Sequence, residues 1–180
     1  MRLTKIGHVL IAVHDLARSR DFYTRVLGFE VLEEDPDHGG VFMTIGEGTH
    51  VIDLVPLPGT QAPHVPQSFA EVRHSLGFRH VGFPVESRRD LRRAYFELID
   101  SHVRVLAAVD HESQESIYFC DPDGNVLEIY WERPDAREIF RRGRQDHDRF
   151  DHLCAGRKQM TMPPATLRLV RRVHPSASSG

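Results

Sequence analysis

The sequence predicts an α+β fold made of two βαβββ modules, because one pattern of segments occurs in it twice. Residues 7–27 (GHVLIAVHDLARSRDFYTRVL) and 79–99 (RHVGFPVESRRDLRRAYFELI) both place His-Val at the start of a short apolar run. In both copies a helix-start signal, an amphipathic helix and three strand-like segments follow. A single module would expose an apolar sheet face, so we expect the two mixed sheets to curl together into a cup.

In the first copy, Asp15 can cap a helix that stops at Gly28. The apolar face of this helix is supplied by Leu16, Phe22, Tyr23 and Val26. Three predicted strands follow, at residues 29–36, 39–46 and 49–57. Asp35-Pro36 and Gly39-Gly40 supply turn signals between the first two.

The second copy has clearer helix signals. Ser87 is a good N-cap with Asp90 three residues later, a variant of the capping box. One buried helical stripe is predicted from the spacing of Leu91, Ala94, Tyr95, Leu98 and Ile99. The predicted strands are residues 103–110, 115–122 and 125–132, with a turn at Asp123-Gly124.

These patterns divide the chain into four parts. Residues 1–58 form the first module, 59–77 a connector, 78–132 the second module, and 133–180 a C-terminal region. That last region is expected to hold one polar helix near Asp135–Arg144, followed by a flexible tail rich in Arg, Pro and Ser. The tail histidines His147, His152 and His174 are assigned to no site.

Composition excludes several classes of protein. With 40% hydrophobic and 27% charged residues the chain resembles an ordinary globular protein, and a net charge of −3 favours neither nucleic acid nor a membrane surface. No apolar run approaches the roughly 18 residues of a membrane span. We interpret the N-terminal MRLTKIGHVLIAV as a first strand and not as a signal peptide. Two cysteines, Cys120 and Cys154, are too few for a disulfide framework and fit a cytoplasmic location.

A metal site is predicted from the repeat. His8 and His80 stand 72 residues apart at the same point of the two copies, so the pseudo-symmetry should bring both to the centre of the cup. Glu128 lies inside the apolar strand NVLEIYWE, where a carboxylate is costly unless it is paired or bound to a metal. Two imidazoles and one carboxylate form the facial triad that suits non-haem Fe(II). Aligning the copies places Asp53 opposite Glu128, so a fourth ligand is an open alternative.

With His8, His80, Glu128 and the doubled module, residues 5–132 resemble the vicinal oxygen chelate superfamily. Its members include extradiol ring-cleaving dioxygenases, glyoxalase I, methylmalonyl-CoA epimerase and the bleomycin and fosfomycin resistance proteins. Residues 109–128 (VDHESQESIYFCDPDGNVLE) are similar to the extradiol signature, in which a His, a Tyr and an Asp-Pro-x-Gly turn precede the metal-binding Glu. In this chain those residues are His111, Tyr118, Asp121–Gly124 and Glu128.

The resemblance, strongest to single-domain type I extradiol catechol dioxygenases, implies a function in the catabolism of aromatic compounds. Fe(II), or else Mn(II) or another divalent ion, would be held by His8, His80 and Glu128. A small aromatic diol and O2 would give a ring-opened semialdehyde. Tyr118 would hydrogen-bond the substrate oxygen and His111 would steer the substrate. The acid–base residue would be His64, with His74 as the alternative in the connector.

Two other functions are left open. A glyoxalase-type or epimerase-type isomerase or lyase would use Asp53 as fourth ligand or as base. A metal-free protein that binds a small molecule such as an antibiotic would need no ligand set at all. The cup with its spare edge also favours a homodimer or a higher homo-oligomer.

Overall fold

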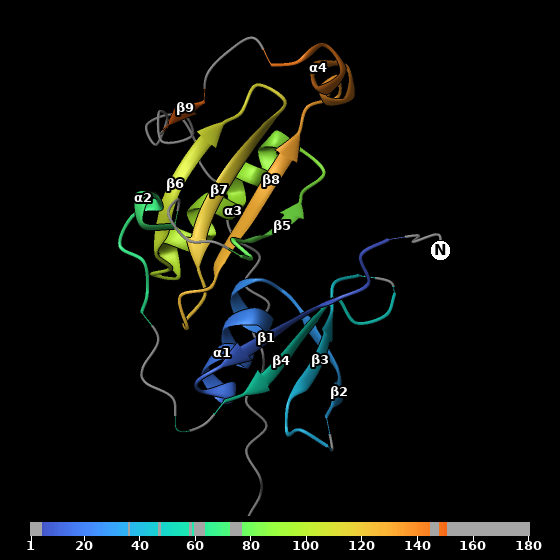
Figure 1. The fold of residues 1–180 in the computed structure, drawn as a ribbon, viewed down its shortest axis with the longest axis vertical. Coiled ribbons are helices and arrows are strands. Elements are labelled where there is room, and N and C mark those ends of the chain that lie inside the picture. The colour runs from blue at the N-terminus through green and yellow to red at the C-terminus, as the bar shows by residue number, and fades with distance from the viewer. Residues whose placement is uncertain are drawn as a thin grey trace, which may run out of the picture.

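The computed structural model describes residues 5–35, 37–46, 48–57, 59, 64–72, 77–144 and 148–150. It confirms the predicted pair of βαβββ modules (Figure 1). The predicted tail falls mostly after residue 150, outside the described residues. Within the described parts of the chain, none of the helices is long and apolar enough to cross a membrane.

The first module begins with β1 (Val9–Val13) and α1 (Leu16–Asp21) and continues with β2 (Glu30–Glu34), β3 (Val41–Thr44) and β4 (Ile52–Pro56). Asp15 caps α1 as predicted, since its side chain accepts a hydrogen bond from the backbone N–H of Arg18. The predicted single helix differs in its second half, where residues Phe22–Val26 form a π-helical turn. Gly28 then follows with φ of +78°, a conformation that glycine adopts without strain.

The second module consists of β5 (Val81–Pro84), α3 (Arg88–Asp100), β6 (Val105–Asp110), β7 (Gln114–Cys120) and β8 (Val126–Glu132). Ser87 accepts a hydrogen bond from the backbone N–H of Asp90 and so caps α3. A short helix α2 (Phe69–Val72) lies in the connector, and the predicted C-terminal helix is α4 (Ala136–Arg142). A short strand, β9 (Arg149–Phe150), was not predicted and pairs with β6.

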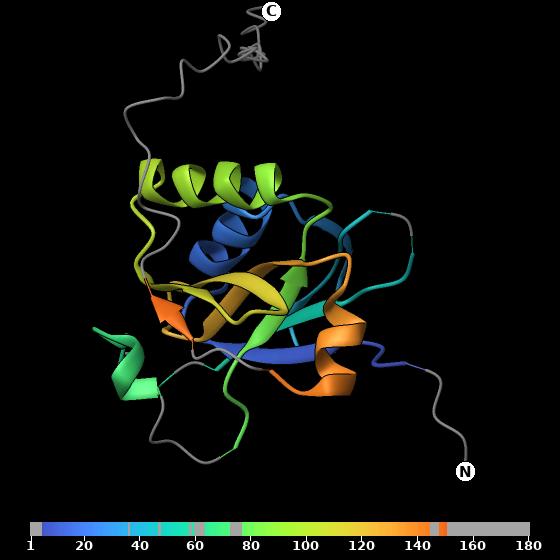
Figure 2. The ribbon, with the colours of Figure 1, turned by 90° about the horizontal axis from the view of Figure 1, so that it is seen from above.

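Both sheets repeat the same strand order. The first runs β1-β4-β3-β2 and the second β5-β8-β7-β6-β9, and the first and last strands of each module are parallel neighbours. The register pairs Leu10 with Asp53 in one sheet and Gly82 with Glu128 in the other. The helices α1 and α3 lie on the same side of the sheets (Figure 2).

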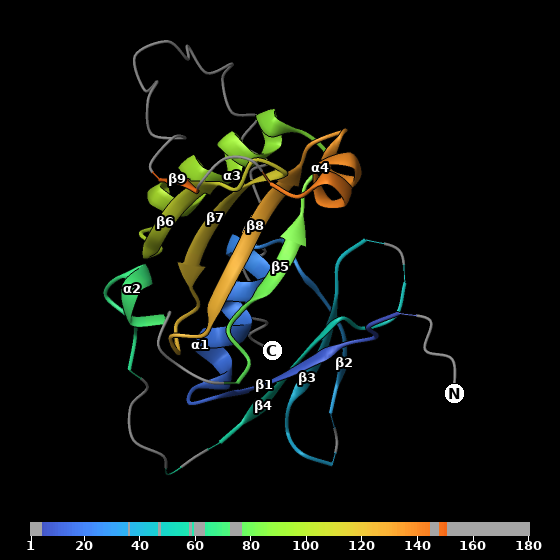
Figure 3. The same ribbon diagram turned by 45° about the horizontal axis from the view of Figure 1, so that its top comes forward.

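The sheet faces toward the helices form the shared core. Ile52 and Leu54 lie in this core on either side of Asp53, and Leu127 and Ile129 do the same around Glu128. Because side chains alternate across a strand, Asp53 and Glu128 point to the opposite sheet faces. The connector covers part of that opposite face in the second module, where residues of α2 pack with residues of β6 (Figure 3).

The Asp-Pro-x-Gly turn of the second module is anchored to the first module. The Asp123 carboxylate accepts hydrogen bonds from Ser19 Oγ at 2.6 Å and from Arg18 Nη2 at 2.7 Å. Tyr23 donates its hydroxyl proton to Asp121 at 3.1 Å, and burial beside that carboxylate strongly raises the pKa of Tyr23. These contacts fix how the two modules meet, so the turn has a structural role beyond reversing the chain.

Candidate metal and catalytic site

Glu128 and His80 lie together on the open face of the second sheet. The imidazole Nε2 of His80 is 3.2 Å from Oε2 of Glu128, and Gln114 Nε2 donates to Oε1 of the same carboxylate at 3.1 Å. Burial alone would raise the pKa of Glu128, but hydrogen bonds from His80, Ser116 and Tyr118 outweigh it and hold that pKa below its usual value. Glu128 is therefore an ionised, oriented carboxylate with 5% of its surface exposed. A carboxylate in this state is suited to bind a metal cation.

Gly82 makes room for this carboxylate. It is the register partner of Glu128, and a Cβ at this position would lie 2.9 Å from Oε2 of Glu128 and 3.2 Å from the Tyr130 ring. Both distances are shorter than ordinary van der Waals contacts. Any larger residue at position 82 would push the carboxylate or the ring out of place.

A chain of hydrogen bonds leads from Glu128 to the C-terminal region. Tyr118 is the register partner of Glu128 on β7 and hydrogen-bonds to it. The Tyr118 hydroxyl also lies 3.0 Å from Nε2 of His111, and Nδ1 of His111 lies 2.8 Å from Oδ1 of Asp148. A carboxylate only accepts hydrogen bonds, so Nδ1 is the donor to Asp148.

The protons of this hydrogen-bonded series can be arranged in two ways, because the Tyr118 hydroxyl carries one proton and has two acceptor neighbours, Glu128 and His111. When Tyr118 donates to Glu128, Nε2 of His111 carries a proton and donates to the phenol oxygen. When Tyr118 donates to His111, Nε2 is bare and the imidazole is neutral. Asp148 in turn accepts a hydrogen bond from Arg144 Nη1 at 2.8 Å.

The connector supplies further groups. The Phe69 ring of α2 packs on the Tyr118 ring with centroids 4.6 Å apart, which places the connector beside the hydroxyl chain. His64 is exposed, and its Nε2 lies 3.1 Å from Oε2 of Glu71. It also lines a cavity together with residues of β1 and the start of β8. The alternative acid–base residue, His74, lies outside the described residues.

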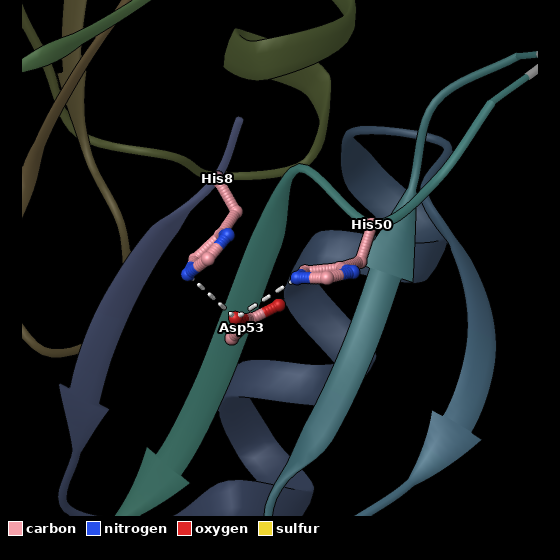
Figure 4. Close-up of side chains that lie close together, drawn as sticks. All are labelled: His8, His50 and Asp53. Atoms are coloured by element: carbon pink, nitrogen blue, oxygen red, sulfur yellow. Dashed lines mark ion pairs between the residues drawn. The ribbon is translucent and has the colours of Figure 1, made fainter. Parts of the chain in front are cut away.

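His8 belongs to a different group, on the first sheet. Its Nε2 is 3.7 Å from Oδ2 of Asp53, and the Nε2 of His50 is also 3.7 Å from that atom (Figure 4). Asp53 is 4% exposed, and its other oxygen, Oδ1, has no hydrogen-bond partner among the described residues. Burial raises the pKa of Asp53, and the imidazoles of His50 and His8 offset this only in part.

The predicted residues therefore fall into two sets within one chain. His80, Glu128, Tyr118 and His111 are linked in the second module, and His8 lies in the first. Among the described residues, the only three ligand-type side chains whose donor atoms all lie within 4.8 Å of one another are His8, His50 and Asp53. The single chain thus does not gather His8, His80 and Glu128 at one point.

Four contributors were missed from the sequence. Gln114 could have been found, since it lies on the same strand face as Ser116 and Tyr118 at a period of two. Gly82 gave the weaker signal of a glycine inside a strand. Asp148 and His50 gave no such signal, because one follows the last predicted helix and the other, in the predicted strand 49–57, has no histidine counterpart in the second copy.

Comparison with known proteins identifies the family. The family model of the Glyoxalase/Bleomycin resistance protein/Dioxygenase superfamily matches residues 5–129. The chain belongs to this superfamily. The resemblance inferred from the repeated module and the position of Glu128 is thereby confirmed.

Individual relatives have different activities. Catechol-2,3-dioxygenase of Bacillus subtilis (strain 168) is 30% identical over 142 residues, which cover 79% of this chain and 46% of that protein. Metallothiol transferase FosB of Staphylococcus epidermidis is 27% identical over 132 residues, covering 69% of this chain and 81% of the relative. This chain therefore spans less than half the length of the dioxygenase.

A solved structure supports the fold alone. The glyoxylase/bleomycin resistance protein/dioxygenase domain from Frankia sp. EAN1pec superposes with a TM-score of 0.61 at 23% identity. The superposition covers 73% of this chain and all of that domain. It agrees with the two-module architecture and says nothing about the reaction.

Proposed function

We propose that this protein is an Fe(II)-dependent extradiol dioxygenase, which cleaves a catechol-type diol with O2 to a ring-opened semialdehyde. The observation that carries the proposal is the hydrogen-bonded chain from Glu128 through Tyr118 to His111. A superfamily member that only polarises a carbonyl has no need for a phenol and an imidazole coupled beside its carboxylate. A diol reaction needs such a pair, because two hydroxyl protons must be handled.

The donor set fits a ferrous ion. His80 and Glu128 supply one imidazole and one ionised carboxylate, and His8 would be the second imidazole of the facial triad. A ferrous ion held in this way would bring the diol oxygens and O2 together and leave positions open for both. The remaining steps depend on the side chains around it.

The neutral form of His111 has the geometry of a general base. Its Nδ1–H is held by Asp148, so Nε2 is free to take a proton from a substrate hydroxyl that replaces the Tyr118 contact. The resulting imidazolium is stabilised by the Asp148 carboxylate and can return the proton to the opened product. Asp148 is a positioning residue in this scheme, because it acts through His111.

Tyr118 and the connector orient the substrate. The Tyr118 hydroxyl would hydrogen-bond a diol oxygen, while Phe69, which already packs on the Tyr118 ring, would border the aryl group. His64 is proposed as a second acid–base group that reaches the substrate from the connector. Its imidazole is exposed and paired with Glu71, so it is fixed in one orientation less firmly than the imidazole of His111.

We also propose that His8 reaches His80 and Glu128 from the first module of a second copy. Its side chain is 51% exposed on the first sheet, and the single chain does not gather the three ligands. A homodimer related by two-fold symmetry would form two such sites. Dimer formation measured by light scattering should therefore accompany activity across a dilution series.

The decisive experiment adds catechol or 2,3-dihydroxybiphenyl to anaerobically Fe(II)-loaded protein and then admits air. A yellow ring-fission product is expected, and Tyr118→Phe or His111→Ala should lower its rate by about 100-fold or more. Tyr95→Phe and His38→Ala serve as matched controls, because both side chains lie away from Glu128. An unchanged rate of product formation in both site variants would contradict the assignment of these residues.

A second candidate is favoured by one observation: Oδ1 of the buried Asp53 has no hydrogen-bond partner among the described residues. In a metal-dependent isomerase or lyase this carboxylate would move a proton on the substrate. Such an enzyme would consume no O2 with any diol and would lose its activity in an Asp53→Asn variant. The oxygen dependence of the same assay therefore separates the two candidates.

A further inference from the structure

His50 joins His8 and Asp53 on the first sheet, although the repeat gives it no histidine counterpart in the second module. Aligning Asp53 with Glu128 sets His50 opposite Asn125, whose side-chain amide instead donates to Asp121 at 2.9 Å. The His50 imidazole is therefore a feature of the first module alone. It lies on the segment just before β4, and Asp53 lies within β4.

The three side chains converge on the sheet face away from the helix (Figure 4). Both Nε2 atoms lie 3.7 Å from the same oxygen, Oδ2 of Asp53, and the two imidazole rings have centroids 4.6 Å apart with a tilt of 40°. Ligands about 2.0–2.1 Å from a transition-metal ion stand about 3 to 3.4 Å from one another. The two nitrogen–oxygen distances therefore exceed those around a bound ion by only a few tenths of an ångström, and the donor atoms of all three side chains lie within 4.8 Å of one another.

Asp53 gives a second, independent indication of a ligand. The side chain is 5% exposed, and Oδ1 has no hydrogen-bond partner among the described residues. A buried carboxylate is costly when its oxygens are unsatisfied, and a bound cation would remove that cost. Position 42 does not help, because the register partner of Asp53 there is Phe42, which offers no donor.

We propose that His8, His50 and Asp53 form a divalent-metal site that is complete within the first module and needs neither His80 nor Glu128. Two imidazoles and a carboxylate suit zinc, cobalt, nickel or ferrous ions. The exposed side of the group, where His8 is half exposed, leaves room for water as a further ligand. The site goes beyond the proposed function and shares only His8 with it, so it is an alternative way for the chain to hold an ion.

The test measures Co²⁺ binding, by calorimetry and by the visible absorption of the bound ion, and needs no enzyme activity. The full-length protein carrying His80→Gln and Glu128→Gln is expected to bind one Co²⁺ per protein chain. Adding His50→Gln should weaken this binding by more than the roughly 10-fold to 100-fold that loss of an outer-shell partner costs. The matched control is His38→Gln, because His38 is exposed in the same module and pairs with Asp35. It should leave binding unchanged.

Absence of Co²⁺ binding in the folded double variant, or binding that His50→Gln does not weaken, would overturn the proposal. Circular dichroism checks that each variant is folded. If the double variant does not fold, the unaltered protein gives the answer by NMR, since Co²⁺ must then shift the ring protons of His50 together with those of His8. Unshifted His50 protons would overturn the site. Because the readout is binding, failure here leaves the oxygen-dependent activity of the proposed function untouched, and the reverse also holds.

Discussion

The two modules place a carboxylate at equivalent positions and surround it differently. Glu128 receives hydrogen bonds from Gln114 and Tyr118 and is paired with His80, whereas Asp53 has two imidazoles at 3.7 Å and one oxygen without a partner among the described residues. The shared fold therefore fixes where the carboxylate stands, and its neighbours decide its chemistry. The second module holds an ionised carboxylate in one orientation, whereas in the first module burial raises the pKa of the carboxylate.

The neighbouring positions differ in the same direction. Across the sheet, Tyr118 faces Glu128 where Phe42 faces Asp53, so only the second module has a hydroxyl at this point. On the other flank, Gly82 stands beside Glu128 and Leu10 beside Asp53. Space and a proton donor were thus provided in the second module alone, which is why we assign the reaction to it.

Glu128→Gln should have the largest effect, because it removes the carboxylate that we propose as the metal ligand of the second module. Ring-cleavage kcat/KM is expected to fall by more than about 100-fold, beyond the usual cost of losing an outer-shell partner. Steady-state kinetics of Fe(II)-loaded protein measures it, with metal content determined alongside. Activity within a few-fold of the parent would place the reaction in the first module instead.

Gly82→Ala should have the next largest effect, because it fills the space that only the second module leaves beside its carboxylate. The new methyl group would stand 2.9 Å from Oε2 of Glu128, so the carboxylate must move and activity should fall by about 10-fold to 100-fold. Leu10→Ala at the equivalent position of the first module is the matched control and should change ring cleavage little. Equal effects of the two substitutions would show that the modules contribute alike.

The anchoring of the second module on the first is tested by Asp123→Ala. This change leaves the fully buried Ser19 hydroxyl without its acceptor and removes the Arg18 ion pair, so the free energy of unfolding should fall by about 2 kcal/mol. Urea unfolding followed by tryptophan fluorescence measures the loss. The exposed Asp21–Arg25 pair gives the control, since Asp21→Ala should cost less than about 0.5 kcal/mol.

A smaller effect should appear in the pH dependence of stability. Burial tends to raise the pKa of Asp110, but the N–H of Glu112 and the guanidinium groups of Arg149 and Arg133 outweigh it and lower that pKa. A carboxylate whose pKa is lower in the folded state than in the unfolded state, where it is near 3.8, stabilises the fold at any pH above that unfolded-state pKa. This contribution is lost as the pH falls through the folded-state pKa.

The stability difference between the parent and Asp110→Asn should therefore be constant from pH 8 to about 5 and shrink below about 4. Thermal unfolding across this range measures it, with Asp100→Asn as an exposed control. A difference that grows as the pH falls would contradict the sign of the shift.

Much of the fold could be read from local patterns. The caps at Asp15 and Ser87 and the alternation around Glu128 act within a few residues, so they predicted the helix starts and the buried carboxylate correctly. The π-helical turn at Phe22–Val26 was missed because its apolar residues also fit an α-helical stripe. Chain position alone cannot separate the two helix types.

The contacts of the candidate site were predictable only where both partners lie on paired strands of one sheet. The pairing of His80 with Glu128 follows from parallel neighbouring strands, and that of His111 with Tyr118 from an antiparallel pair. The association of His50 with His8 depends on a loop, and that of Asp148 with His111 on a segment 37 residues away. Such contacts arise from tertiary packing, which leaves no periodic signal.

The most direct test of the proposed reaction is the stoichiometry of oxygen uptake. An oxygen electrode and the absorbance of the ring-fission product should be followed together while a limiting amount of 2,3-dihydroxybiphenyl is consumed. An extradiol dioxygenase incorporates both oxygen atoms, so one O2 should disappear for each diol opened, with no hydrogen peroxide released. Loss of substrate without oxygen uptake, or oxygen uptake that ends in hydrogen peroxide, would contradict ring cleavage by this site.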